Sequence, residues 1–383
     1  MPGLRPDVDP DGLLEYSVVY TDRALNHMSR RFRDALCDIS SMLRQAYGAD
    51  AAVVVPGSGT FAMEAVARQF VGGADATAVL VVRNGWFSYR WSQILEAARP
   101  RASIAVLKAR AVSAAPQAAF APVPAEEVAQ AIRSQRPSVV FAPHVETSAG
   151  MLLPDAYLRR IAEAAHEVDA LFVLDCVASG ALWVDMRALG VDVLVSAPQK
   201  GWSATPCAGF AMLSARALQR LESTRSDSFA CDLAAWLKVM RAYEAGGHAY
   251  HATMPTDALV RVRDAMREGF DIGLARLQQA QLELGARVRD SLRRRGVASV
   301  AAPGFEAPGV VVCHTRDPRI QNAQAFVDAG VQIAAGVPLA CDEPKDFMSF
   351  RVGLFGLDKL LDVDGAVRRL EAAFDAVGLR QAA

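Results

Sequence analysis

Short apolar runs alternate with longer amphipathic stretches through the first half of the chain. The apolar runs are rich in β-branched residues and read TAVLVV, SIAVL, PSVVFA, ALFVLD and VDVLVS. Between them lie helical patterns such as TFAMEAVARQF and DAYLRRIAEAAHEV. Apolar strands that alternate with helices are typical of a parallel sheet covered on both faces. The pattern therefore predicts an α/β fold with a mostly parallel central sheet.

The pattern changes towards the C-terminus. From Asp257 to Arg295 the helical periodicity is uninterrupted, which suits a spine that joins two domains. Beyond this spine, strand-like GVVVCHT and FMSFRVGL and helical DVDGAVRRLEAAFDAV predict a smaller α+β unit. We therefore expect three parts: an N-terminal segment lining the cleft (1–28), a large domain (29–260), and a connecting helix with a small C-terminal domain (261–383).

Composition favours a small molecule as the partner. The chain has 383 residues, 52% of them hydrophobic, which is enough for a sizeable core. The 41 basic residues nearly balance the 42 acidic ones, so the charge predicts neither nucleic acid nor an anionic membrane as a partner. Six scattered cysteines without a C-x-x-C pair indicate reduced thiols. With no signal peptide or membrane span predicted, we expect a soluble, cytoplasmic protein.

The residues that follow the predicted strands are the candidate site, because ligands of open α/β sheets bind at the carboxyl ends of the strands. PGSGT (56–60) places glycines and hydroxyls directly before a helix, which suits a phosphate and equally suits an ordinary N-cap. Asp175 ends an apolar strand. Its carboxylate either has a cationic or donor partner or caps the following turn.

Lys200 is the one charged residue in SAPQKGWSATPCAGF (196–210). A lysine in an enclosed apolar site has a lowered pKa and can attack a carbonyl as a free amine, whereas an exposed loop lysine would be unremarkable. An anion cradle, a buried acid and an isolated amine lie at neighbouring strand ends. Pyridoxal 5′-phosphate (PLP) needs all three, for its phosphate, its ring nitrogen and its aldehyde carbon.

Five motifs in order strengthen this interpretation: PGSGTFAMEA, HVETSAG, FVLDCVASGALWVDMRALGVDVLVSAPQKG, YHATMP and FRVGLFG. Together they resemble the class V, fold-type I aminotransferases of the alanine–glyoxylate and serine–pyruvate group. The resemblance covers most of the chain. It implies a PLP-dependent transaminase that works through an aldimine on Lys200. Such an enzyme moves an amino group from a small amino acid (alanine, serine or a related donor) to glyoxylate or pyruvate.

The resemblance also implies roles for single residues. Lys200 would hold the cofactor and move the substrate proton, Asp175 would pair with the ring nitrogen, and Arg351 would bind the substrate carboxylate. Further cofactor contacts are expected from Val177 and Phe87 (or Trp86) on the two ring faces, from Thr147 at the ring hydroxyl, and from Ser58, Gly59, Thr60 and Gln199 at the phosphate. Tyr250 and Thr253 would reach the phosphate of the neighbouring subunit, which implies a homodimer with shared sites. No metal is expected.

The N-terminal segment departs from the family, which usually has a Gly-Pro-Gly-like stretch beside the substrate. Here the stretch reads EYSVVYTDRALNHMS. We expect it to line the substrate side of the site. This stretch contains Arg23, Asn26 and His27, which either bind a second polar group of the substrate or form a structural network.

A cysteine desulfurase, or another PLP-dependent lyase on the same scaffold, is the alternative. Desulfurases carry a histidine immediately before the lysine and a reactive cysteine on a loop well upstream of the carboxylate-binding arginine. Here Gln199 precedes Lys200, and Cys341 lies only 10 residues before Arg351. These departures favour the transaminase.

Overall fold

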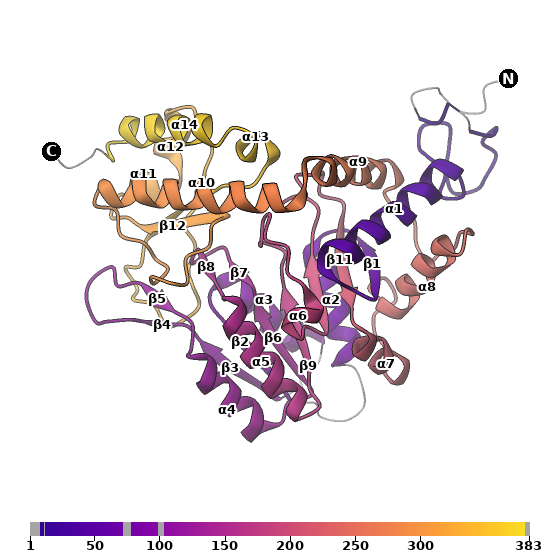
Figure 1. The fold of residues 1–383 in the computed structure, drawn as a ribbon, viewed down its shortest axis with the longest axis horizontal. Coiled ribbons are helices and arrows are strands. Elements are labelled where there is room, and N and C mark those ends of the chain that lie inside the picture. The colour runs from indigo at the N-terminus through magenta and orange to yellow at the C-terminus, as the bar shows by residue number, and fades with distance from the viewer. Residues whose placement is uncertain (1–7, 11, 72–77, 99–102, 380–383) are drawn as a thin grey trace.

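The computed structural model describes residues 8–10, 12–71, 78–98 and 103–379. Within them, a seven-stranded sheet of order β1-β11-β10-β9-β6-β2-β3 lies at the centre (Figure 1). Its strands are β1 (Ala51–Pro56), β2 (Ala78–Arg83), β3 (Ser103–Lys108), β6 (Val139–Pro143), β9 (Leu171–Asp175), β10 (Val193–Ser196) and β11 (Ala208–Leu213). In this sheet β11 is antiparallel to β1 and β10, and the remaining neighbours are parallel. The predicted α/β fold with a mostly parallel sheet is confirmed.

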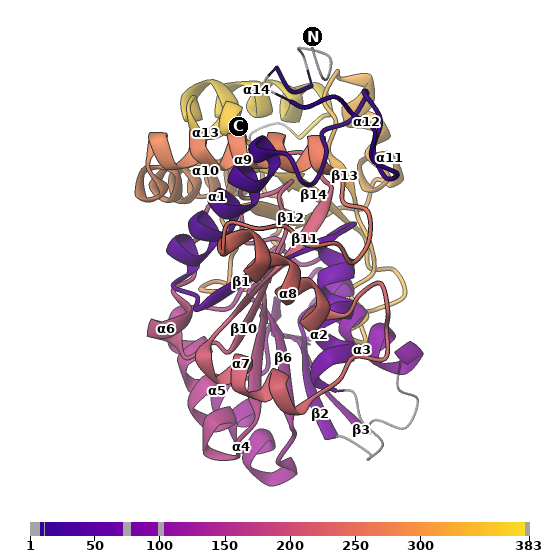
Figure 2. The same cartoon turned by 90° about the vertical axis from the view of Figure 1, so that its right-hand side faces the viewer.

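Helices cover both faces of this sheet, because each connection between parallel strands must cross over it. They are α1 (Arg30–Tyr47), α2 (Gly59–Phe70), α3 (Trp86–Ala98), α4 (Ala125–Gln135), α5 (Asp155–Glu167), α6 (Met186–Leu189), α7 (Ala215–Ser223) and α8 (Leu233–Glu244). Figure 2 shows α4, α5 and α6 on one side of the strands and α2 and α3 on the other. Among the described helices, none is long and apolar enough to cross a membrane.

A second sheet, of order β12-β14-β13, follows the helical spine in the sequence, as predicted for the smaller α+β unit. The strands of this sheet are β12 (Val310–His314), β13 (Ala334–Ala335) and β14 (Ser349–Gly353). The helices of this part of the chain are α10 (Leu274–Arg294), α11 (Pro318–Gln321), α12 (Gln324–Asp328), α13 (Leu357–Leu360) and α14 (Val363–Ala376). Leu284 and Val288 of α10 share an apolar core with Phe350 and Phe374. Two short strand pairs complete the described part: β4 (Arg110–Ala111) with β5 (Phe120–Ala121), and β7 (Val145–Glu146) with β8 (Met151–Leu152). The domain limits at 28 and 260 stay predictions.

The helical spine is two helices, not the single one that the pattern predicts. α9 (Thr256–Ile272) and α10 meet at Gly273, whose φ of +101° is a conformation that glycine adopts readily. The indole N–H of Trp183 donates to the carbonyl of Leu274 at 3.1 Å and fixes the break. Periodicity alone missed this break, because a glycine within a helical pattern is often tolerated.

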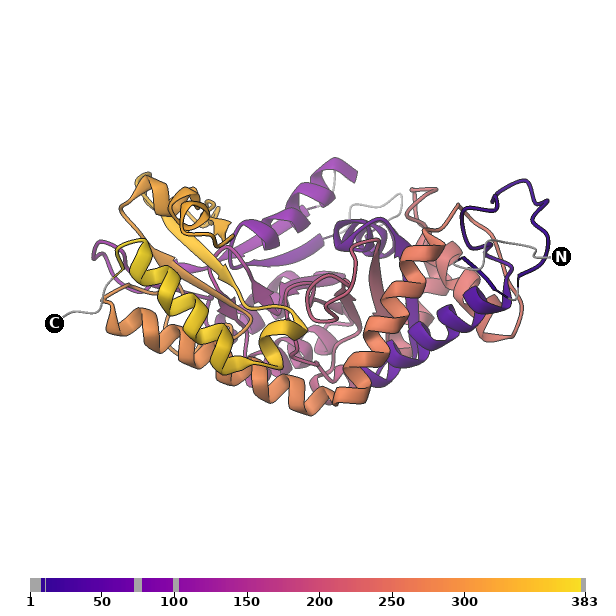
Figure 3. The same cartoon turned by 90° about the horizontal axis from the view of Figure 1, so that it is seen from above.

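Residues 8–10 and 12–29, the described part of the chain before α1, form no helix or strand. This N-terminal segment lies at the end of the molecule opposite to α14 and the three-stranded sheet (Figure 3). One tie to the spine is the amide of Leu25, which donates to Asp257 at 3.1 Å. The Tyr20 hydroxyl donates to the Met254 carbonyl at 3.3 Å. The segment therefore packs on the chain leading into α9.

Candidate active site

Five turns that carry predicted site residues meet at one edge of the large sheet. They follow β1, β2, β6, β9 and β10, which all run in the same direction, so their carboxyl ends lie side by side. The turns comprise residues 57–60, 84–87, 144–148, 176–177 and 197–200. The expected gathering of strand-end residues is thus present.

Lys200 is half-buried in the turn after β10. Its Nζ lies 5.0 Å from the centre of the Phe355 ring. Burial lowers the pKa of the Lys200 amine, and the nearby charge of Arg351 lowers it further. The charge of Asp175 acts in the opposite direction. The surroundings therefore favour the neutral amine, which is the form that attacks a carbonyl.

Asp175 is buried at the end of β9, where its Oδ1 accepts a hydrogen bond from the Val177 amide at 3.0 Å. Burial raises the pKa of Asp175 to about 6, although the Val177 N–H lowers it. The charge of Glu146 adds to the rise, while Arg90 and Lys200 oppose it. A buried carboxylate of this kind is stabilised by a cation placed against it, such as a protonated ring nitrogen.

The turn after β1 brings a helix N-terminus close to Asp175. A Cβ at Gly59, the first residue of α2, would lie 2.9 Å from a methyl group of Val177, so glycine is required for this approach. The Ser58 hydroxyl makes no capping hydrogen bond to α2. Thr60 Oγ1 accepts a hydrogen bond from Arg90 Nη1 at 2.9 Å. A helix N-terminus with a hydroxyl and a guanidinium beside it suits a phosphate.

Phe87, rather than Trp86, faces the other site residues. Its ring centre lies 5.4 Å from the guanidinium carbon of Arg351 and 5.5 Å from that of Arg90. Trp86 is 36% exposed and packs against the Tyr89 ring. The geometry favours Phe87 as the residue that stacks on a cofactor. Sequence reasoning missed Arg90, although its spacing of three residues from Phe87 places both on one helix face.

Arg351 reaches the same edge from the other sheet. β14 pairs it with Val312 on one side and Ala334 on the other. Its Nε donates to the Ala335 carbonyl at 2.8 Å, and among the described residues this is the one hydrogen bond of its side chain. Both Nη groups therefore remain for a ligand. Burial lowers the pKa of the guanidinium and the charge of Glu146 raises it, but an arginine stays cationic in proteins.

The other predicted site residues fall into two groups. Thr147 is buried beside the site, and Gln199 is exposed next to Lys200. Tyr250 and Thr253 lie between α8 and α9, with their oxygens 2.9 Å apart. The Tyr250 ring lies against His27 of the N-terminal segment. The predicted contact of this pair with a neighbouring subunit stays a prediction.

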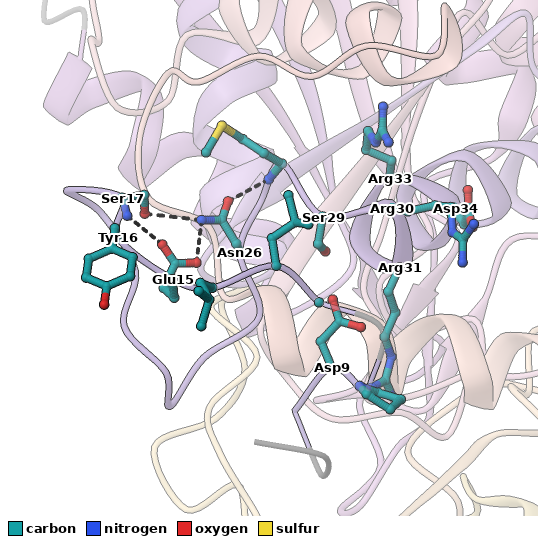
Figure 4. Close-up of a pocket in the computed structure, with 15 residues that line it drawn as sticks. Asp9, Glu15, Tyr16, Ser17, Asn26, Ser29, Arg30, Arg31, Arg33 and Asp34 are labelled. Carbon is teal, nitrogen blue, oxygen red and sulfur yellow. Dashed lines mark hydrogen bonds between the residues drawn. The ribbon is translucent and has the colours of Figure 1, made fainter. Parts of the chain in front are cut away.

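The N-terminal segment holds a network of its own (Figure 4). The Asn26 amide donates to Glu15 at 2.8 Å and to Ser17 at 3.1 Å. His27 is buried, and its ring centre lies 5.6 Å from that of Tyr250. The segment and the start of α1 form an open pocket of about 1120 Å³, lined by Asp9, Pro10, Gly12–Ser17, Asn26, Met28–Arg31, Arg33 and Asp34. For Asn26 the structural network is what the geometry supports.

Two other reactive side chains are engaged in buried hydrogen bonds. His144 Nδ1 lies 2.7 Å from the Ser179 hydroxyl, and burial lowers the pKa of His144 to about 4. The Cys341 thiol donates to the Arg83 carbonyl at 3.4 Å. Burial, with smaller contributions from nearby carboxylates, raises the pKa of Cys341 to about 12. Neither group is poised for chemistry at neutral pH.

Comparison with known proteins gives consistent findings. The family model described as Aminotransferase class-V matches residues 13–349. The 2-aminoethylphosphonate–pyruvate transaminase of Paraburkholderia phymatum is 30% identical over 365 residues, covering 94% of this chain and 91% of that protein. The enzyme of the same name from Burkholderia mallei is 31% identical with the same coverage. Among solved structures, alanine–glyoxylate aminotransferase from Nostoc sp. has a TM-score of 0.78 and 25% identity, covering 93% of this chain and 89% of its own.

Proposed function

The chain belongs to the class V aminotransferases, and from this premise we propose that it moves an amino group from a small amine donor to pyruvate or glyoxylate with PLP bound at Lys200. The donor is alanine, serine or a related compound. The observation that carries the proposal is that Arg351 and Lys200 lie at the same edge of the sheet, because a 2-oxo acid needs a group that binds its carboxylate close to the reacting amine.

The residues present fit PLP. Asp175 is a buried carboxylate with a raised pKa, which a protonated pyridine nitrogen would stabilise. Gly59 brings the α2 N-terminus against the same turn, where the hydroxyls of Ser58 and Thr60 suit the phosphate. Phe87 and Val177 belong to the two turns flanking this region and are proposed to hold the two ring faces.

When bound, PLP supplies an electrophilic carbon and an electron sink. The chain's own groups do the rest. Burial lowers the pKa of the Lys200 amine and so favours its neutral form; this amine would accept a proton from the substrate α-carbon and deliver it to the former aldehyde carbon of the cofactor. Arg351 binds the substrate carboxylate through its two Nη groups and so orients the α-carbon. Asp175 would hold the ring nitrogen protonated.

The relatives add a candidate donor. Two of the proteins compared above are named for 2-aminoethylphosphonate as donor and pyruvate as acceptor, and a structural neighbour is named for alanine and glyoxylate. Every acceptor in these names carries an α-carboxylate, which Arg351 suits. We therefore include 2-aminoethylphosphonate with alanine and serine as donors to be tested.

A half-reaction screen tests the proposal. Each donor is added to the holoenzyme and the absorbance of the Lys200-bound cofactor is followed, and pyruvate or glyoxylate is then added. We expect one donor to bleach the absorbance and an acceptor to restore it. A protein that carries no PLP adduct on Lys200 after incubation and borohydride reduction would contradict the proposal.

The desulfurase alternative needs an accessible thiolate near the substrate. Cys341 is buried, its thiol donates a hydrogen bond to a backbone carbonyl, and its pKa is raised to about 12. A thiol of this kind is a poor nucleophile at neutral pH. The transamination proposal is therefore favoured, and cysteine enters the donor screen with sulfide release as its readout.

We propose a homodimer in which the N-terminal segment and the Tyr250 region together face the second subunit. Large apolar side chains of this segment are exposed, with Leu13 at 87% and Tyr16 at 89%. Tyr250, which contacts the same segment, is 52% exposed. Large apolar side chains that are exposed along one segment favour burial against protein. Sedimentation velocity tests this: a monomer with fully bound cofactor at low concentration would contradict it.

A further inference from the structure

Glu146, at the end of β7, is a buried carboxylate that is not among the proposed cofactor or substrate contacts. It is 1% exposed. Its Oε1 accepts hydrogen bonds from the Phe87 amide at 3.2 Å and from the amide and hydroxyl of Ser148 at 3.0 and 2.8 Å. Its Oε2 accepts hydrogen bonds from the amide and hydroxyl of Ser88 at 2.8 and 2.7 Å. Five donors from two separate turns therefore converge on one side chain.

These donors explain how the carboxylate is tolerated. Among the described residues, no cation forms an ion pair with Glu146, and an unpaired buried charge is costly. Two of the five donors are amides of the first turn of α3, where the helix dipole favours a negative charge. Glu146 therefore caps α3 from a strand 59 residues away along the chain.

The turn after β2 is shaped around this side chain. A Cβ at Gly85 would lie 2.0 Å from the Ser148 hydroxyl oxygen and 2.7 Å from a Glu146 side-chain carbon. Only glycine allows the turn to approach so closely. The Ser148 hydroxyl in addition accepts a hydrogen bond from the Trp86 amide at 2.9 Å, which joins the two turns a second time.

The two turns that Glu146 joins carry two proposed cofactor contacts, Phe87 and Thr147. The charge of Glu146 also acts on the two ionised groups of the site, Asp175 and Arg351. We propose that Glu146 is a positioning residue, which fixes the Phe87 ring and the Thr147 side chain in register for the cofactor. This inference rests on the proposed binding of PLP.

Glu146→Gln is the test, with Glu126→Gln, at an exposed carboxylate paired with Arg160, as the matched control. In the amide, one of the two acceptor oxygens becomes an NH2 group, which faces at least one backbone N–H donor. A serine hydroxyl can turn to accept from the NH2 group, but a backbone N–H cannot, so at least one of the five hydrogen bonds is lost. PLP affinity is measured by absorbance titration of the apoprotein, together with the visible circular dichroism per bound PLP and the melting temperature of the apoprotein.

We expect Glu146→Gln to weaken PLP binding about tenfold or more, the factor for one charge-assisted hydrogen bond. The visible circular dichroism should fall as well, because the ring is less firmly oriented. The control should leave both unchanged. A purely structural cap would lower the melting temperature and leave the PLP dissociation constant and the dichroism as in the wild type, and that result would overturn the proposal.

Two outcomes keep this test separate from the proposed function. If the wild-type protein binds no PLP at Lys200, the proposed function fails first. If Glu146→Gln does not fold, Ser148→Ala serves instead, since it removes one donor to Glu146 and keeps the carboxylate. We expect Ser148→Ala to weaken PLP binding two- to threefold. An unchanged dissociation constant in Ser148→Ala would then overturn the positioning role.

Discussion

Asp175→Asn should stabilise the apoprotein at neutral pH while removing most of the transaminase activity. Burial raises the pKa of Asp175 from its ordinary 3.8 to about 6, so ionised Asp175 disfavours the folded state. At about 1.4 kcal/mol for each pKa unit, this lowers the free energy of unfolding by about 3 kcal/mol above pH 6. Asparagine keeps an acceptor for the Val177 amide, so the hydrogen bond at 3.0 Å survives the substitution.

The direction of the Asp175 pKa shift determines the pH range over which the stability changes. The folded state holds a proton on Asp175 more tightly than the unfolded state does, so wild-type stability falls as pH rises from about 4 to about 6 and is level above that. Asparagine does not titrate. The difference in stability between the variant and the wild type should therefore be small near pH 4 and reach its full size above pH 6.

Thermal unfolding of both apoproteins between pH 4 and pH 8 checks this, and differences between the two proteins are compared because a chain of this size need not unfold in two states. Asp169→Asn is the control: that carboxylate is exposed, and its pKa is lowered by hydrogen bonds and ion pairs with Arg216 and Arg220. The reasoning is refuted if Asp175→Asn melts at or below the wild-type temperature at pH 8. It is also refuted if the difference in melting temperature between Asp175→Asn and the wild type is as large at pH 4 as at pH 8.

Further variants test the other assigned groups. Arg351→Lys keeps the charge but loses the planar fork, so KM for pyruvate and for alanine should rise by a similar factor, about 30- to 150-fold for a cost of about 2–3 kcal/mol; an unchanged KM speaks against a carboxylate clamp. Phe87→Ala should weaken PLP binding measured by absorbance titration and Trp86→Ala should not, and the reverse order would assign the stacking position to Trp86. Tyr250→Phe should weaken PLP binding in proportion to the dimer fraction seen by sedimentation, and equal loss in a monomer would place Tyr250 at its own subunit's site.

Local sequence patterns were enough to predict the central sheet and the edge of it at which the candidate site lies. Strands alternating with helices leave few topologies, and parallel strands place their carboxyl ends together, so Lys200 and Asp175 could be assigned to one site from local patterns. The family motifs, each of which is contiguous, pointed to the class V aminotransferases, and the family model confirmed them. Strand and helix patterns and contiguous motifs are properties of short segments, so they can be recognised in a single sequence.

The contacts between side chains of different segments depend on the three-dimensional packing and could not be predicted from local patterns. Glu146 lies in a motif that the sequence displays, but its five hydrogen bonds depend on how closely the turn after β2 approaches β7. Arg90 became a candidate once α3 placed it against Thr60. The N-terminal segment packs on the chain before α9, a placement set by packing between segments more than 200 residues apart, which no periodicity records. Hydrophobic patterns specify which face of an element is buried, but close packing in three dimensions selects the partner of each polar group within that face.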